Sequence, residues 1–319
     1  RQRQMCIRDS NFIPRFPSNT APAISSAVPI KRDWTVRTDD GHCFELKVSG
    51  PKKPRAAILF LPAMGVLARY YAPLAEALEK AELMLVRAEL RGIGTSSLRP
   101  RRRVDFGYRH IVESDLPAAL ETLRARAPNL PVYLAGHSLG GQLALLYAAS
   151  TAPEVAGVLM IACGSPYYKC WSGRQRLGLL LARVIAPALG TVMGYVPGKR
   201  LGIGSEREAT TLIRHWAANA RTGQYLLRRS QVDYEVALAK YQGKVLAIAI
   251  EGDELAHRAA IDFMLDKVPP AQSRRVDVEL SARKPRGHFR WVREPNAVVS
   301  AMLSELEGPS PHQESPTLR

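Results

Sequence analysis

The chain has 319 residues, of which 46% are hydrophobic and 23% charged. This apolar content excludes a mostly disordered chain, which would bury too little surface to offset the entropy cost of folding. The formal net charge of +16 comes from 34 arginines and 11 lysines against 29 acidic residues. Nucleic acid, an anionic membrane or an acidic substrate are therefore the partners to consider.

The excess charge is concentrated in two parts of the chain. Residues 165–230 hold 11 basic and 2 acidic side chains, a net charge of +9, and residues 1–60 carry a net +6. Residues 61–164 and 231–319 are close to neutral, at +2 and −1. No nucleic-acid-binding module is recognisable, so we expect no nucleic-acid partner.

The two ends of the chain are expected to be disordered, namely residues 1–30 and 308–319. Residues 1–10 resemble the strings that arise from translated sequencing adapters. Residues 1–30 lack the apolar segment of a signal peptide, and the four cysteines have neither zinc nor redox spacing. We therefore expect a reducing, cytoplasmic location with no metal and no cofactor.

Strand and helix patterns alternate along residues 31–307, which we predict to be one domain. Residues 34–48 alternate around Asp40-Gly41, which is typical of a hairpin. Further strands are predicted at 56–61, 83–89, 132–135, 155–162, 244–250 and 275–280, and helices at 71–80, 114–126, 143–149, 256–267 and 296–306. The alternation predicts an α/β fold with a mostly parallel sheet flanked by helices. A long, arginine-rich, mainly helical insertion at about 165–240 interrupts it.

The motif Gly136-His137-Ser138-Leu139-Gly140 follows the strand at 132–135 and opens a helix. A nucleophile elbow requires this context, because the serine must sit on a tight turn with small residues on both sides of it. The alternative is a glycine-rich turn with a helix-capping serine. We interpret Ser138 as the nucleophile and the Leu139 N–H, at the helix N-terminus, as an oxyanion donor.

Chain order in this kind of site places an acid and then a histidine after the nucleophile. Asp253 follows the buried strand at 244–250 and is the candidate acid, with Glu254 as a rival; Asp253 could instead only cap the next helix. His288 lies on a loop before the last helix and is the candidate base. His257 is too close to Asp253 in sequence, and His312 lies in the tail.

The second oxyanion donor is expected in the turn after the strand at 56–61. The Met64 N–H is the first choice and the Ala63 N–H the next, with Gly65 allowing a sharp turn. Gly92-x-Gly94 lacks the third glycine of a dinucleotide loop. The basic run at 99–103 has no interleaved aromatic residues and is interpreted as a solvated surface.

These residues together resemble the α/β-hydrolase superfamily, over about residues 34–307. Within it, the chain resembles a bacterial group of predicted α/β hydrolases related to the monoglyceride-lipase and serine-aminopeptidase-like clan. The matching stretches are PAMGVLARYYAPLAEAL, ELRGIGTSS, GHSLGGQLAL, EGDELA and RGHFRWVRE, together with residues 197–225 of the insertion. The resemblance implies a triad of Ser138, Asp253 and His288 and makes the insertion a lid. Many relatives have His-Gly where this chain has Pro62-Ala63. This difference affects which backbone N–H group of the loop serves as oxyanion donor.

The expected activity is that of a serine hydrolase, a carboxylesterase or lipase-like enzyme acting on a small acyl or ester substrate. A serine peptidase or amidase, or a non-catalytic binding protein on the same scaffold, are the alternatives. A peptidase would need a site for a substrate amino terminus, and the basic lid shows no acidic cluster. The apolar lid segment at 177–196 suits an acyl or aromatic ester or weak contact with an anionic membrane surface. Arg183 and Pro187 interrupt it, so a membrane span is disfavoured, and its apolar residues could instead pack on the sheet.

Overall fold

The computed structural model describes residues 30–306, apart from residues 152, 203 and 281–286. The predictions of disorder at 1–30 and 308–319 fall outside these residues, except that Ile30 begins the first strand. His312 and Cys6 also lie outside them. The three cysteines that are described, Cys43, Cys163 and Cys170, are free thiols.

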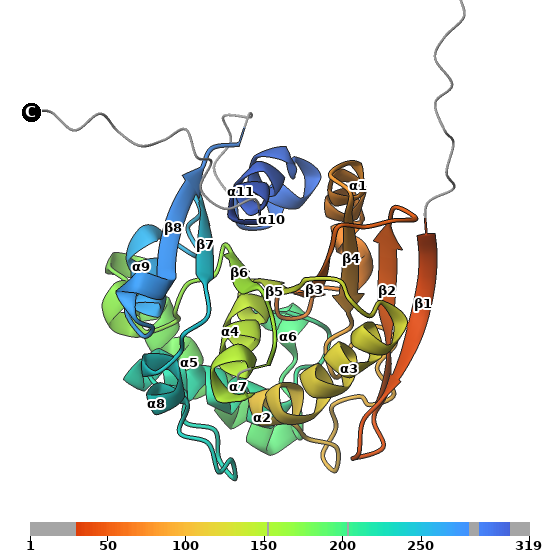
Figure 1. The fold of residues 1–319 in the computed structure, drawn as a ribbon. Helices are drawn as coiled ribbons and strands as arrows, with labels where there is room; N and C mark the ends of the chain where they lie inside the picture. The colour runs from red at the N-terminus through yellow and green to blue at the C-terminus, as the bar shows by residue number, and fades with distance from the viewer. Residues whose placement is uncertain (1–29, 152, 203, 281–286, 307–319) are drawn as a thin grey trace, which may run out of the picture.

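The core of the fold is an eight-stranded sheet in the order β1-β2-β4-β3-β5-β6-β7-β8 (Figure 1). Only the pairings β1–β2 and β2–β4 are antiparallel, and every other pair is parallel. The predicted mostly parallel sheet is therefore confirmed, with an antiparallel hairpin at one edge. The strands are β1 (Ile30–Arg37), β2 (Cys43–Gly50), β3 (Ala56–Leu61), β4 (Leu83–Ala88), β5 (Val132–His137), β6 (Gly157–Ile161), β7 (Val245–Ile250) and β8 (Ser273–Val278).

Helices cover both faces of the sheet, as an α/β fold requires. Helices α1 (Ala72–Lys80) and α11 (Asn296–Leu306) lie side by side over one face, and α3 (Leu116–Arg126) and α4 (Leu139–Thr151) lie over the other (Figure 1). Helix α9 (Arg258–Leu265) packs on β7 and β8.

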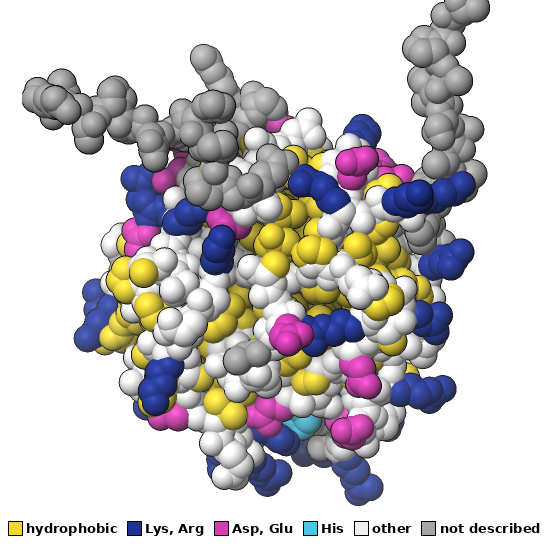
Figure 2. All heavy atoms as spheres, in the orientation of Figure 1, with side chains coloured by type: hydrophobic (Ala, Val, Ile, Leu, Met, Phe, Trp, Pro, Cys, Tyr) yellow, Lys and Arg dark blue, Asp and Glu magenta, His cyan; other side chains and the backbone are white. Residues whose placement is uncertain are grey.

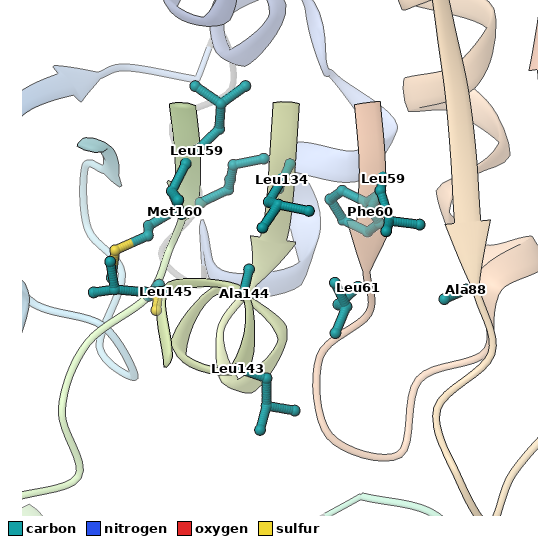
Figure 3. Packing of buried hydrophobic residues seen from close by; sticks show 14 of the residues in the cluster. Leu59, Phe60, Leu61, Ala88, Leu134, Leu143, Ala144, Leu145, Leu159 and Met160 are labelled. Carbon is teal, nitrogen blue, oxygen red and sulfur yellow. The ribbon is translucent and has the colours of Figure 1, made fainter. Parts of the chain in front are cut away.

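The central strands are apolar on both faces because both faces are covered. All residues of β3, β6 and β7 are buried, and α4 is buried from Leu139 to Ala148. Figure 3 shows side chains of β3, β5, β6 and α4 meeting in one cluster, among them Leu61, Leu134 and Leu143. This packing fixes the position of the turn between β5 and α4.

Several element boundaries differ from the predicted ones. Strand β5 continues to His137 and α4 begins at Leu139, so strand and helix are separated by Ser138 alone. The helix predicted from 114 starts earlier, with α2 (Tyr108–His110) and a π-helical turn, η2 (Ile111–Asp115), in front of α3. Helix α9 starts two residues later than predicted, at Arg258.

Helical segments fill the chain between β6 and β7. They are η3 (Tyr168–Cys170), α5 (Gly173–Met193), α6 (Gly198–Leu201), α7 (Thr210–Thr222) and α8 (Tyr234–Ala239). We use the word lid for this segment, residues 165–240, as a label of its position in the chain only. Helix α5 packs along α7.

Much of the apolar surface of α5 faces away from the protein. Leu177, Val184 and Val192 are 58%, 62% and 71% exposed, so the interpretation that these residues pack on the sheet is wrong. By length and mean hydropathy (1.5), α5 is the one helix in the described part of the chain that could cross a membrane. The charged Arg183 and the helix-disrupting Pro187 lie within this helix.

The arginines of the basic run at 99–103 are exposed, as predicted, and two of them also donate hydrogen bonds to backbone carbonyls. Arg99 donates from both Nη atoms to the carbonyls of the preceding turn, including that of Gly94 at 2.6 Å. Arg102 donates to the carbonyl of Val192 at 2.7 Å, near the C-terminus of α5. A cation near a helix C-terminus satisfies free carbonyls and the helix dipole. This run therefore connects the core to the lid.

A second contact between lid and core depends on a neutral histidine. His215 of α7 is buried, and its Nδ1 accepts a hydrogen bond from the Tyr108 N–H at 3.2 Å. Beside it, Asp105 accepts from the Thr211 N–H at 2.9 Å and from the Thr211 hydroxyl at 2.6 Å. Burial lowers the pKa of His215 to about 4, because a charged imidazole would lose its hydration there.

Acid should therefore weaken the docking of the lid. The unfolded chain binds a proton at His215 near pH 6.5, whereas the folded chain does so only near the lowered pKa of about 4. Stability should fall as the pH drops through this window. The variant His215→Gln keeps a hydrogen-bond acceptor but cannot titrate. We therefore expect its free energy of unfolding to fall less than that of the parent protein between about pH 7 and pH 5, as measured in urea titrations. His42, whose pKa burial also lowers to about 4, still titrates in both proteins. An unchanged pH slope in His215→Gln would contradict this assignment.

Candidate active site

Ser138 occupies the single residue between β5 and α4, in a strained backbone conformation. Its φ of 53° lies in the left-handed region, which a serine adopts only where its surroundings enforce it. The Ser138 N–H donates to the Ile161 carbonyl at 3.0 Å, which anchors the turn to β6. Ser138 is partly exposed whereas His137 and Leu139 are buried, so the turn presents the serine outward.

The two glycines of the motif are required by close backbone contacts. A β-carbon on Gly136 would lie 2.2 Å from the carbonyl carbon of Gly140. A β-carbon on Gly140 would lie 2.1 Å from the carbonyl oxygen of Leu61, at the end of β3. The steric reason for small residues at both positions is therefore confirmed.

Asp253 uses its two carboxylate oxygens for two different purposes. Oδ1 accepts from the backbone N–H groups of Leu255 and Ala256, at 2.8 and 3.1 Å, and so caps the turn before α9. Oδ2 lies 2.8 Å from Nδ1 of His288. Asp253 therefore pairs with the histidine, and the alternative that it only caps the next helix is wrong, because the N-cap residue of α9 is His257 and no side chain caps that helix. Glu254 is exposed and His257 packs its ring against Trp171, so neither takes part in this pair.

His288 lies on α10 (Gly287–Arg290), directly after the segment 281–286 that is not described. The Asp253 side chain is completely buried and that of His288 is 8% exposed. Since Nδ1 is bound to the carboxylate, Nε2 is the ring nitrogen left for another partner. A carboxylate in this position fixes the tautomer of the ring and stabilises the imidazolium.

One N–H group of the loop after β3 is hydrogen-bonded within the protein and is therefore not free to bind a ligand. The Ala63 N–H donates to the Tyr71 hydroxyl oxygen at 2.9 Å, and this oxygen lies 2.8 Å from Nδ1 of His137. The Ala63 N–H is therefore already used inside the protein. This favours the neighbouring Met64 N–H, rather than that of Ala63, as the donor for an oxyanion.

Two tyrosines that the sequence did not single out, together with His137 of the serine motif, connect this loop to His288. Tyr71 is fully buried in η1 (Ala68–Tyr71), and Tyr70 donates from its hydroxyl to the Phe289 carbonyl at 2.8 Å. The His137 ring lies 4.7 Å from that of His288, centroid to centroid. Burial keeps the pKa of His137 well below its usual range, so this ring is neutral. A tyrosine pair one turn after the loop was the available signal, since a buried hydroxyl needs a partner.

The lid reaches the same loop. Gly65 has a φ of 71°, and a β-carbon there would overlap the backbone of Gly204 and Ser205. Glu208, a buried carboxylate, lies next to Gly204. It accepts a hydrogen bond from the Ser205 N–H at 2.8 Å, and burial raises its pKa. No group of three or more His, Cys, Asp or Glu side chains that could hold a metal occurs within the described ranges.

The chain matches the family described as serine aminopeptidase, S33, over residues 52–276. It is 31% identical over 108 residues to human monoglyceride lipase and 33% identical over 121 residues to a putative monoglyceride lipase of Schizosaccharomyces pombe. These matches cover 34% and 37% of this chain and 35% and 31% of the two relatives, so the chain spans about a third of the length of each.

Solved structures show the same fold at low identity. The α/β hydrolase GrgF from Penicillium sp. sh18 matches with a TM-score of 0.60 and 16% identity, over 87% of this chain and 98% of that one. Three findings point to the same family. They are the order of the strands, the strained serine between strand and helix, and the family match over most of the chain. The chain belongs to the serine aminopeptidase S33 family of the α/β-hydrolase superfamily.

Proposed function

We propose that the protein is a serine hydrolase that cleaves carboxylic esters through an acyl-enzyme intermediate. The observation that carries this proposal is the pairing of His288 with buried Asp253, 2.8 Å apart, in a fold that presents Ser138 from a strained turn. The two relatives named as monoglyceride lipases support an ester as the substrate class.

In this mechanism the Ser138 hydroxyl attacks the ester carbonyl carbon and passes its proton to Nε2 of His288. The N–H groups of Leu139 and Met64 bind the oxyanion of the tetrahedral intermediate. When the intermediate collapses, His288 gives the proton to the departing alkoxide oxygen. Water then attacks the acyl-enzyme and gives a proton to His288. When this second tetrahedral intermediate collapses, the bond to Ser138 breaks, His288 returns the proton to the Ser138 oxygen, and the carboxylic acid leaves. Asp253 holds the ring and stabilises its charged form.

A peptidase or amidase is the second candidate, and one residue favours it. Glu208 is a buried carboxylate of the lid beside the oxyanion loop, where it could face a substrate amino group. Its Oε1 is engaged by the Ser205 N–H, so we rank an ester first. A non-catalytic binding protein on this scaffold would leave the strain at Ser138 and the His288–Asp253 pair without a purpose.

We further propose that the lid contacts an anionic membrane surface through α5. Its exposed apolar side chains include Leu181 and Val184, and Arg174 and Arg176 lie exposed at its N-terminal end. A helix that is apolar on one side and edged by arginine suits the lipid–water interface.

The substrate class can be decided with a panel of p-nitrophenyl esters of different chain length beside aminoacyl p-nitroanilides. We expect kcat/KM to be higher for an ester, and Ser138→Ala to lower kcat by at least about 10⁴-fold because it removes the nucleophile. Ser150→Ala, in the last turn of the helix that follows Ser138, is the control and should keep the parental rate. Faster turnover of the anilides would favour the peptidase, and no turnover of either class would favour the binding protein.

Tyr71→Phe should lower kcat by about tenfold with little change in KM, because the Ala63 loop and His137 lose their shared hydrogen-bond partner. The free energy of unfolding should fall by about 1 kcal/mol. The matched control is Tyr133→Phe, since Tyr133 is a half-buried tyrosine of β5. Parental kcat in Tyr71→Phe, measured on the best ester, would show that the loop does not depend on this hydroxyl.

Sedimentation with phosphatidylglycerol vesicles at low salt tests the membrane contact. The parent protein should bind the vesicles at low salt. It should dissociate from them as the salt concentration rises, because salt screens the arginines. Replacing both Leu181 and Val184 by serine should weaken binding, because both side chains are more than half exposed. Val236→Ser, at an exposed position of α8, should not weaken it. Absence of parental binding at low salt would refute the contact.

A further inference from the structure

A cleft of about 530 Å³ lies away from Ser138, between α1 and the edge of the sheet formed by β1, β2 and β4. Its sheet side includes Lys47, Ser49 and Arg87, and its helix side includes Ala72 and Ala75, whose small side chains leave the space open. Figure 2 shows basic and acidic side chains close together over α1 and the adjoining ends of β1 and β2. A cleft of this volume has the size of a small-molecule site.

The register of the strands places like charges opposite each other in this cleft. Asp33, Lys47 and Arg87 form one row across β1, β2 and β4, because Asp33 pairs with Lys47 and Lys47 with Arg87. Lysine and arginine directly opposite each other destabilise a sheet unless a negative charge compensates them. Asp33 compensates Lys47, to which it is bonded at 3.1 Å.

Among the described residues no carboxylate lies within ion-pair distance of Arg87, although the more distant charges of Asp33 and Glu89 favour its charged form. Arg87 is 7% exposed, and its Nη2 donates to the neutral Ser49 hydroxyl at 2.8 Å. Its Nε is buried without a hydrogen-bond partner, and no ion pair within the described part of the chain gives it a carboxylate. A buried guanidinium with an unpaired Nε and no carboxylate bonded to it is costly, so its presence needs an explanation. A bound anion would supply both the charge and the acceptor.

We propose that this cleft is a binding site for a small molecule that carries a carboxylate or a phosphate. The anionic group lies against Arg87 and Lys47 on the sheet, and Arg69 of η1 lies at the end of the cleft. A guanidinium matches both oxyanions through paired N–H groups. Glu76 and Glu79 line the helix side and would accept hydrogen bonds from hydroxyl or ammonium groups of the same ligand. The site is separate from the proposed ester site and makes no use of Ser138.

The experiment is isothermal titration calorimetry of the full chain with inorganic phosphate and, separately, with acetate, at constant ionic strength. We expect saturable binding of one of them with a Kd of about 1 mM, and the stronger of the two identifies the anion class. Arg87→Met should weaken it by at least about tenfold, because a charge-assisted hydrogen bond is lost. Arg126→Met, at an exposed position of α3, is the matched control and should bind as the parent does.

Lys47→Met provides a second test if Arg87→Met does not fold, and it should weaken binding at least about threefold. Two results would overturn the proposal. One is the absence of saturable binding of either anion up to about 20 mM. The other is parental affinity in Arg87→Met or, where that variant does not fold, in Lys47→Met.

Discussion

The close approach of α4 to the end of β3 is the constraint on which the rest of the site depends. Gly140 lies so near the Leu61 carbonyl that no β-carbon fits between them. This contact places the first turn of α4, with its free N–H groups, directly beside the loop that follows β3. Ser138 is left in a left-handed conformation between strand and helix, and the buried core around α4 maintains the strain.

A second set of contacts connects the Ser138 turn with the loop after β3 and with His288. The Tyr71 hydroxyl connects the loop at Ala63 to His137, and the His137 ring packs on His288. Tyr70 ties the segment after His288 to the same short helix. His288, the loop after β3 and the Ser138 turn are thus connected by one group of aromatic side chains, although they come from distant parts of the chain. Preorganisation of this kind costs nothing at the moment of reaction.

The sequence predicted those features that depend on local pattern. Buried strands appear as short apolar runs, and the elbow appears as a glycine motif between a strand and a helix, so β3 and the Ser138 turn were located correctly. The pairing of Asp253 with His288 followed from chain order alone. The contacts of Tyr71, Arg87 and Arg102 could not be predicted, because each depends on which segments tertiary packing brings together. The exposure of α5 could not be predicted either, because an apolar helix pattern does not show which other elements cover the helix.

The central claim is that Ser138 is a nucleophile activated by His288, and reaction with a fluorophosphonate followed by peptide mass spectrometry tests it most directly. Our account predicts one adduct per chain, located on Ser138, and a rate of labelling that falls by at least about 10³-fold in His288→Ala. An adduct on another residue, or labelling of His288→Ala at the parental rate, would contradict it.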